Sequence, residues 1–431
     1  MRQKKVLYAA LALSTLVGVS ACGGSSDTST EGGSTELTGR GPITLVQGKD
    51  TSGFVQDVLD EWNKEHPDEK VTLVELPEDA DSQRQQMIQN AQTESDEYDV
   101  LVVDVVWNAE FAANKYIAEL PEEEFPTDQM FGPTLDTAKY YGKLYSIPQA
   151  SDGGLLYYRK DLLEAAGIDA PPETWAEMED QCKQIQATPE GKGVGCYAGQ
   201  FDKYEGLTVN AAEAINGAGG EIIGDDGKPN VDTPEAAEGL DFLASSFDSG
   251  LIPKQAITYQ EEEGRRAFQA GNLIFHRQWP YQYALANATD GSSKVAGKFE
   301  VAPLPGMDGP GVSSLGGHNM AISTYSKHQQ TAMDFIKFYT SPEQARKQLE
   351  MASLAPIYTD IYEDPELQKK FPFLPTLKDS ILSAEPRPKV VNYGDATIAI
   401  QDAAYAALQG DMSSEEAVAQ MQTELEEVTK K

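Results

Sequence analysis

Residues 98–107, YDVLVVDVVW, form the run that decides the fold: nearly every position is apolar, and only Asp99 and Asp104 interrupt it. Such a run is typical of a central strand in a parallel sheet that helices cover on both faces. Asp104 lies at the end of the run, where we expect its carboxylate to point toward a crevice.

The residues before this run alternate between strand and helix patterns. Ile43–Gln47 and Val71–Leu76 favour strands, the apolar residues of 54–62 recur at helical spacing, and Gln83–Gln92 predicts a second, polar helix. This β-α-β-α-β order predicts a doubly wound α/β sheet, and such sheets bind ligands beyond the carboxyl ends of their strands.

Length and charge limit the classes of function. The chain has 431 residues, with 34 Lys and Arg against 69 Asp and Glu, so its net charge of −35 gives no basic surface for a nucleic-acid backbone. The length predicts two or three packed units. The four histidines and three cysteines match none of the usual zinc spacings, and we expect no metal and no cofactor.

The N-terminus predicts export. Three basic residues within 2–5 precede an apolar run, Val6–Val19, which is long enough for the core of a signal peptide but too short to span a bilayer. It ends in Val-Ser-Ala-Cys at 19–22, which resembles the lipobox of bacterial lipoproteins. We therefore expect residues 1–21 to be removed and Cys22 to be lipidated; the alternative is a plain signal peptide cut near Ala21.

Residues 22–40 are rich in Gly, Ser and Thr and predict a flexible tether between the membrane and the folded body. Two cysteines remain after it. Cys182 and Cys196 bracket a polar loop, and outside the cell a pair this close predicts a disulfide. A redox-active pair is the alternative, but the chain has no CxxC.

Later segments predict crossings between two lobes. Extended runs at 140–148 and 153–159 are broken by proline and glycine, and 303–317 is rich in both. Helix starts are readable at Thr233, Ser341 and Ser413.

Four side chains could carry function, each with a structural alternative. Asp104 fits a sugar hydroxyl, or caps a helix that starts near Asn108. Asp152 is a cleft carboxylate or a turn residue. Trp279 stacks on a pyranose or packs in the core. Arg387, between two prolines, holds vicinal hydroxyls or a structural carboxylate.

The acidic runs Glu122–Glu124 and Glu261–Glu263 are interpreted as solvated faces, because no ordered calcium loop is present.

Several phrases together resemble the extracellular solute-binding proteins of carbohydrate ABC importers, in the maltose and trehalose group. They are YDVLVVDVVWNAEFA (98–112), GKLYSIPQASDGGLLYYRKDLL (142–163), TWAEMEDQC (174–182), FDKYEGLTVN (201–210), FHRQWPYQYALA (275–286), LGGHNMAIS (315–323), FIKFYTSPEQ (335–344) and PRPKVVNY (386–393).

The resemblance implies a periplasmic-binding-protein-like fold of two α/β lobes, each a doubly wound sheet flanked by helices. We expect an N-lobe of 41–149 plus 303–355 and a C-lobe of 150–302 plus 356–431, joined near 148–152, 302–310 and 353–357.

The resemblance also implies site residues. Relatives of the trehalose type usually carry aromatics where this chain has Gln149-Ala150 and His318, and often a glutamate in the first loop, where it has Lys49, Asp50 and Thr51. The expected ligand-binding residues are Lys49, Asp50, Thr51, Asp104, Asn108, Asp152, Trp279, Gly316, Gly317, His318 and Arg387.

The function implied is a monomeric, non-enzymatic receptor, anchored to the outer face of the bacterial cell membrane through Cys22. It would pass a di- or oligosaccharide, such as an α-glucoside, to an ABC permease. One alternative is a secreted glycoside hydrolase that uses Asp104 and Asp152 as its carboxylate pair. The other is the same fold with a non-sugar ligand.

Overall fold

The computed structural model describes residues 37–224 and 226–430. The expected signal peptide at 1–21, Cys22 and most of the tether at 22–40 lie outside the described residues.

The described strands are β1 (Ile43–Gly48), β2 (Val71–Leu76), β3 (Val100–Asp104), β4 (Lys139–Tyr140), β5 (Lys143–Leu144), β6 (Ser146–Gly153), β7 (Leu155–Tyr158), β8 (Gly195–Ala198), β9 (Leu273–Gln278), β10 (Glu300–Ala302) and β11 (Leu315–Ile322). The helices in the first half are α1 (Val55–Glu65), α2 (Ala80–Gln92), α3 (Asn108–Ala113), α4 (Gly132–Thr137), α5 (Lys160–Ala166), α6 (Trp175–Gln186) and α7 (Glu205–Gly217). Those in the second half are α8 (Pro234–Ser249), α9 (Glu261–Gln269), α10 (Gln282–Ala286), α11 (Gln329–Tyr339), α12 (Pro342–Ala352), α13 (Thr359–Glu363), α14 (Pro365–Lys370), α15 (Leu374–Leu382), α16 (Tyr393–Gln409) and α17 (Ser414–Thr429). Short 3₁₀ turns lie at Glu122–Glu124, Thr127–Gln129 and Lys254–Thr258.

The first sheet has the strand order β2-β1-β3-β11-β6. β1 pairs in parallel with β2 and β3, which confirms the predicted β-α-β-α-β opening. β3 is buried along 100–103, as the apolar run predicts, but it ends at Asp104 because Val105–Trp107 turn into α3. β11 then adds antiparallel to β3, and β6 antiparallel to β11.

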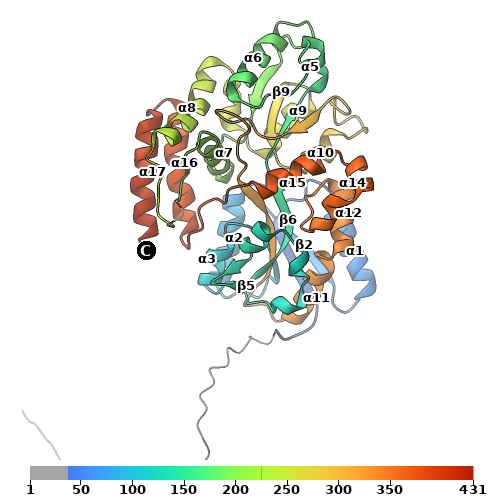
Figure 1. Cartoon of the computed structure of the whole chain (residues 1–431). Coiled ribbons are helices and arrows are strands. Elements are labelled where there is room, and N and C mark those ends of the chain that lie inside the picture. Colours follow the sequence, from blue (N-terminus) through green and yellow to red (C-terminus); the bar gives the residue numbers. More distant parts are fainter. Residues whose placement is uncertain (1–36, 225, 431) are drawn as a thin grey trace, which may run out of the picture. The chain divides into compact units, whose positions relative to one another are not determined.

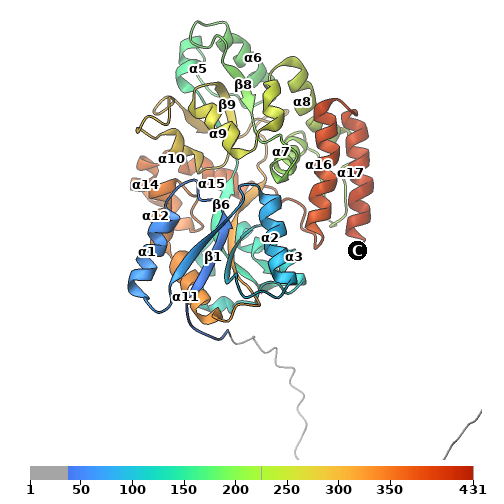
Figure 2. The same ribbon diagram turned by 180° about the vertical axis from the view of Figure 1, so that it is seen from behind.

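The second sheet has the order β10-β7-β9-β8, and only β8 and β9 are parallel. The sheets are therefore mixed, and not the parallel sheets that the sequence pattern predicts. The reason is connectivity. β6 runs into β7 through Gly154 alone, without the helix that a parallel crossover requires. The α/β fold of two lobes is nevertheless the one expected, and Figures 1 and 2 show the two sheets with helices around each.

Two segments join the sheets. The first is Gly154, between β6 and β7, and the second is 303–314, between β10 and β11. α15 lies against the first: the Ser380 hydroxyl donates to the Gly154 carbonyl at 2.9 Å, and a Cβ on Gly153 would lie 2.5 Å from the Ser380 oxygen. The lobe limits given above stay a prediction.

The predicted helix starts are confirmed. The side chains of Thr233, Ser341 and Ser413 each accept a hydrogen bond from the backbone N–H three residues on. α16 and α17 pack against α7 and α8, and Figure 1 shows them side by side beside the second sheet.

A disulfide joins Cys182 in α6 to Cys196 in β8, with their Cα atoms 5.7 Å apart, as predicted. It closes a loop with a sequence separation of 14. No helix within the described residues is both long and apolar enough to span a bilayer.

Because the disulfide closes a short loop, its loss removes a constraint on the unfolded chain worth about 3 kcal/mol. We expect Cys182→Ala/Cys196→Ala to unfold at a lower guanidinium concentration than the native protein, and reductant to destabilise the native protein but not the variant. Equal unfolding midpoints for both proteins in the absence of reductant would contradict this expectation.

Candidate functional site

Strand pairing brings distant residues to one edge of the first sheet. β1 and β3 are parallel, so Gly48 and Asp104 end at the same edge. β11 is antiparallel to both of its neighbours, which places His318 beside Asp104 and Gly316 beside Asp152. No local sequence pattern reveals this register.

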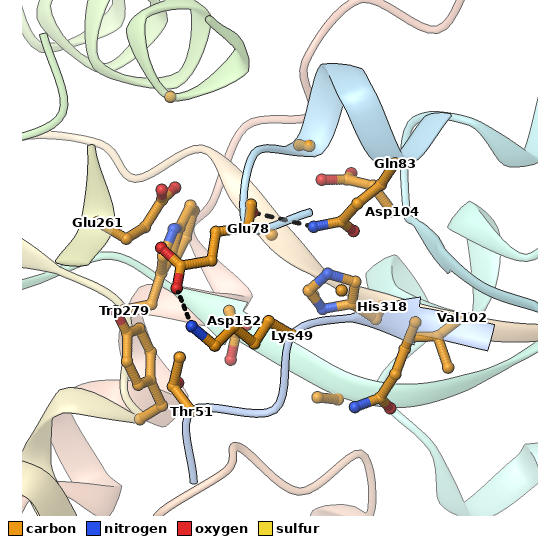
Figure 3. A pocket seen from close by; sticks show the side chains of 18 of the residues that line it. Lys49, Thr51, Glu78, Gln83, Val102, Asp104, Asp152, Glu261, Trp279 and His318 are labelled. Atoms are coloured by element: carbon orange, nitrogen blue, oxygen red, sulfur yellow. Dashed lines mark hydrogen bonds and ion pairs between the residues drawn. The ribbon is translucent and has the colours of Figure 1, made fainter. Parts of the chain in front are cut away.

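A cavity of about 290 Å³ lies at this edge. Figure 3 shows labelled side chains around it, with Trp279 and Glu261 on one side, Gln83 and Asp104 on the other, and Asp152 between them. The expected ligand-binding residues that line it are Lys49, Asp50, Thr51, Asp104, Asp152, Trp279, Gly316, Gly317, His318 and Arg387.

Asn108 is not among the lining residues. It starts α3, its residue surface is 1% exposed, and its Oδ1 accepts a hydrogen bond from Ser146 at 2.8 Å. The structure therefore brings ten of the eleven expected residues together and places Asn108 behind them. The alternative role of Asp104 as the cap of the helix near Asn108 is not what the structure shows. The Asp104 Oδ1 accepts from the backbone N–H of Val106, which precedes α3.

Arg387 is the most strongly held side chain of the site. One terminal nitrogen donates to Asp104 Oδ1 at 2.7 Å, and the other donates to Glu205 Oε1 at 2.5 Å. Glu205, the first residue of α7, also accepts from the hydroxyls of Tyr393 and Thr397. Arg387 thus has structural carboxylates as partners, and only its buried Nε lacks a hydrogen bond among the described residues.

The first loop is held by its own aspartate. The Asp50 carboxylate accepts from the backbone N–H groups of Ser52, Gly53 and Val55, and so caps the start of α1. Lys49 forms an ion pair with Glu78 at 2.8 Å, drawn as a dashed line in Figure 3. Of the three expected loop residues, Thr51 alone makes no side-chain hydrogen bond within the described chain.

Asp152 differs from the other carboxylates of the site. No hydrogen bond to its carboxylate forms within the described part of the chain. Burial raises the pKa of Asp152 to about 7; the charge of Arg277 acts against this, and that of Asp104 adds to it. Burial also raises the pKa of Glu205 to about 7, although Arg387 opposes the shift. A ligand that donates hydrogen bonds to Asp152 would stabilise its charged form.

Trp279 follows β9 at the predicted strand-to-helix turn and forms the aromatic wall of the cavity. The guanidinium carbon of Arg277 lies 3.8 Å from its ring centroid, so one face of the indole is covered. At Gly316, a Cβ would lie 2.7 Å from the ring, so only glycine allows this approach. Trp279 is half-buried and lines the cavity, so the part of its ring that these contacts leave open is available to a ligand.

The glycine at 317 is required for a different reason. Its φ is +113°, and a Cβ there would lie 2.2 Å from the Ala150 carbonyl oxygen. Beside it, His318 is open to the cavity but enclosed by the walls, and burial lowers the pKa of its imidazole. It therefore offers a neutral ring with one donor and one acceptor.

The interpretation of Glu261–Glu263 as a solvated face is wrong. These residues begin α9 and line the cavity. Glu262 is 7% exposed and bonds to Arg265 and to the Tyr281 hydroxyl, and Glu261 accepts from Tyr204 at 2.7 Å. Three like charges in a row predict solvent exposure only when no partner lies nearby, and Arg265 supplies one.

Sequence reasoning missed further lining residues. Gln149 and Glu205 also line the cavity. The Oε1 of Gln149 is buried and has no partner in the described chain, and Glu205 binds Arg387. Glu205 carries no local signal, because its partners Arg387 and Tyr393 come from a segment far along the chain. Taken together, the lining residues include an acceptor without a partner at Asp152, buried polar atoms without partners at Gln149 and Arg387, and the indole of Trp279. The other large aromatic side chains that line the cavity are Phe54, Trp107 and Tyr281.

Two α/β lobes with a polar cavity of this kind define a two-lobed solute-binding protein. The chain belongs to the family of bacterial extracellular solute-binding proteins, whose family pattern matches residues 47–346.

Comparisons with individual proteins agree. A probable ABC transporter-binding protein of Deinococcus radiodurans is 34% identical over 360 residues, which are 81% of this chain and 84% of that protein. The structure of maltose-bound MalE3 of T. maritima is 32% identical, with a TM-score of 0.85, and the match covers 89% of this chain and 98% of that one. An ABC transporter solute-binding protein of Thermotoga lettingae, bound with α-D-tagatose, is 22% identical and shares the fold, with a TM-score of 0.82 over 90% of this chain and 100% of its own.

The raised pKa of Asp152 predicts a pH dependence of stability. Between its ordinary value of 3.8 and about 7, the folded protein keeps a proton that the unfolded chain loses, so the contribution of Asp152 to stability falls as pH rises through this window. We expect Asp152→Asn to gain stability relative to the native protein from pH 4.5 to 7.5, in urea unfolding measured at each pH.

The control is Asp169→Asn, the same substitution at an exposed position. Glu205 is present in all three proteins, so it cancels from the comparison. The expectation fails if the native protein and Asp152→Asn show parallel curves of stability against pH.

Proposed function

We propose that this protein is a lipid-anchored extracellular receptor that binds a di- or oligosaccharide between its two lobes and delivers it to the permease of an ABC importer. An α-glucoside of the maltose or trehalose type is the first candidate ligand. The proposal includes a monomeric protein and no catalytic activity.

One observation carries the proposal: an aromatic plane lies beside polar groups that lack partners. The uncovered face of Trp279 suits the apolar face of a pyranose, and the unpaired acceptor at Asp152 suits hydroxyl donors. The hydroxyl of Thr51, which also lines the cavity, adds a donor. A sugar presents both an apolar face and a ring of hydroxyls, so it satisfies all of these groups together.

The comparisons support the same ligand class. MalE3 of T. maritima, at 32% identity, is bound to maltose in its structure. The cavity volume of about 290 Å³ is at the lower end of ligand pockets and favours a short saccharide. Gln149-Ala150 and His318 stand where trehalose-type relatives usually carry aromatics, so we expect Trp279 to supply the stacking plane without aromatic side chains at these positions.

The expected lobes, 41–149 plus 303–355 and 150–302 plus 356–431, would close around the ligand as a hinge. Lys49 and Glu78 line the cavity from the first of these, and Glu261 and Trp279 from the second. A ligand that touches both sets of residues favours the closed arrangement by its differential affinity.

A glycoside hydrolase fits the site less well. Asp104, one member of the carboxylate pair such an enzyme would use, is ion-paired with Arg387 and accepts from a backbone N–H. Arg387 donates to both oxygens of Asp104, at 2.7 and 3.5 Å, so this carboxylate is already engaged and has little freedom to attack a substrate or to activate water. A non-sugar ligand is the second alternative, and a ligand screen decides it.

We expect a saccharide to raise the melting temperature of the protein in a screen that includes maltose, trehalose and longer maltooligosaccharides. Trp279→Ala should weaken the best affinity at least about tenfold, since it removes the stacking plane. Trp279→Phe, which keeps a planar ring, is the matched control and should lose less. Affinity is measured by titration calorimetry.

Two outcomes would contradict the proposal. Release of new reducing ends from the oligosaccharides would show an enzyme, and unchanged affinity in Trp279→Ala would remove the indole from the site. A melting-temperature rise with amino acids or polyamines and none with sugars would favour the non-sugar alternative.

Anchoring through Cys22 is tested separately. In the full chain expressed in a bacterium, we expect Cys22→Ser to move the protein from the membrane fraction to the soluble fraction, because the lipid-bearing thiol is lost. Cys182→Ala/Cys196→Ala is the matched control and should stay with the membrane. A Cys22→Ser protein that remains in the membrane fraction would contradict lipidation at this residue.

A further inference from the structure

An ion pair lies directly behind the indole of Trp279 without lining the cavity. The guanidinium of Arg277 stacks on the ring at 3.8 Å from its centroid, and its side chain is 1% exposed. A cation at this distance over the face of an indole is attracted by the ring's electron density. Arg277 is therefore placed to act on a ligand through Trp279, besides the effect of its charge on the pKa of Asp152.

Arg277 is itself held at each of its nitrogens. Its Nε donates to Glu213 Oε2 at 2.7 Å, a terminal nitrogen donates to Glu213 Oε1, and the other donates to Gln200 Oε1 at 3.2 Å. The two-bond contact with Glu213 fixes the plane of the guanidinium. Since the guanidinium carbon lies over the ring at 3.8 Å from its centroid, a guanidinium held in this way limits how far the indole can move toward it.

The same pair touches both segments that join the sheets. Glu213 Oε1 accepts from the backbone N–H of Ser314 at 3.1 Å, in the second joining segment. At Gly154, in the first, a Cβ would lie 2.8 Å from Arg277 and 2.9 Å from Glu213. The Gly154 N–H donates to the Ser313 hydroxyl at 2.6 Å, which links the two segments beside the pair.

Stability alone gives little reason for such a pair. Burying two charges costs desolvation that their attraction only partly returns, and apolar replacements of buried pairs are often as stable. The pair instead fixes the orientation of the two side chains, because the several hydrogen bonds that each of them makes can form together in one arrangement.

We infer that Arg277 is a positioning residue for ligand binding: with Glu213 it sets the orientation of the Trp279 face that contacts the ligand and ties that face to both segments joining the sheets. This inference rests on the proposed function, in which Trp279 contacts a sugar.

The test is a double-mutant cycle in affinity for the best sugar from the screen. Arg277→Met/Glu213→Gln removes both charges, so neither is left buried alone. We expect it to weaken affinity about tenfold in the native background, and no more than about twofold in a Trp279→Leu background, where no indole remains to be positioned. Arg277→Lys, which keeps the charge, should recover part of the affinity.

A second measurement needs no ligand. The fluorescence of Trp279 is obtained as the difference between a protein and the same protein with Trp279→Leu. We expect acrylamide to quench this difference signal more strongly in Arg277→Met/Glu213→Gln than in the native protein, because an unsupported indole moves more. Arg159→Met/Asp161→Asn removes another two-bond ion pair outside the cavity and should change neither measurement.

The outcomes separate the two proposals. If the native protein binds no sugar, the proposed function fails. Equal acrylamide quenching of Trp279 in Arg277→Met/Glu213→Gln and in the native protein would overturn the role of Arg277, whether or not a sugar binds. If the native protein binds but the double variant loses affinity equally in both backgrounds, Arg277 does not act through Trp279, and the inference is overturned while the proposed function stands. Circular dichroism checks that the variants fold. If the double variant is unfolded, the same double-mutant cycle is measured with Arg277→Lys in the native and Trp279→Leu backgrounds.

Discussion

The site depends on one buried cation with two acidic partners. Arg387 joins Asp104, at the end of β3, to Glu205, at the start of α7, and the hydroxyls of Tyr393 and Thr397 complete the coordination of Glu205. Charges removed from water must be paired, so these segments can stay buried only in this arrangement. The first sheet, α7 and α16 are therefore held together beside the cavity.

This pairing divides the acidic residues of the cavity into two kinds. Asp50, Asp104, Glu205 and Glu262 are committed to backbone amides or to arginines, and so they shape the walls. Asp152 is left without a bond, and burial raises its pKa. A negative net charge in the cavity therefore does not by itself indicate a cationic ligand. The group that has no partner determines what the cavity can accept, and its need is for hydrogen-bond donors.

Much of the local structure could be predicted from the sequence, because it depends on neighbours along the chain. The buried strand ending at Asp104, the helix caps and the disulfide follow from patterns of a few residues. Partnerships between distant segments could not be predicted. Glu261–Glu263 looked like a solvated run because Arg265 and Tyr281 were not recognised as partners, and Glu205 gave no signal because Arg387 lies far along the chain. The place of Asn108 behind the cavity could not be predicted for the same reason, because its partner Ser146 lies on a distant strand.

The glycines near the aromatic wall show how the sheet register and the side chains depend on each other. Gly316 admits the indole of Trp279 against β11, and Gly154 admits the pair of Arg277 and Glu213 behind it. A side chain at either position would push the ring out of its plane before any ligand arrived. Because the backbone of Gly316 and the guanidinium of Arg277 both lie against the indole, a stacked ligand does not have to order the ring, which is the advantage of a preorganised site. Gln149-Ala150 and His318 supply no tyrosine, tryptophan or phenylalanine beside Trp279. Selectivity among ligands that stack equally well on Trp279 therefore depends on the other lining side chains, polar ones as well as Phe54, Trp107 and Tyr281.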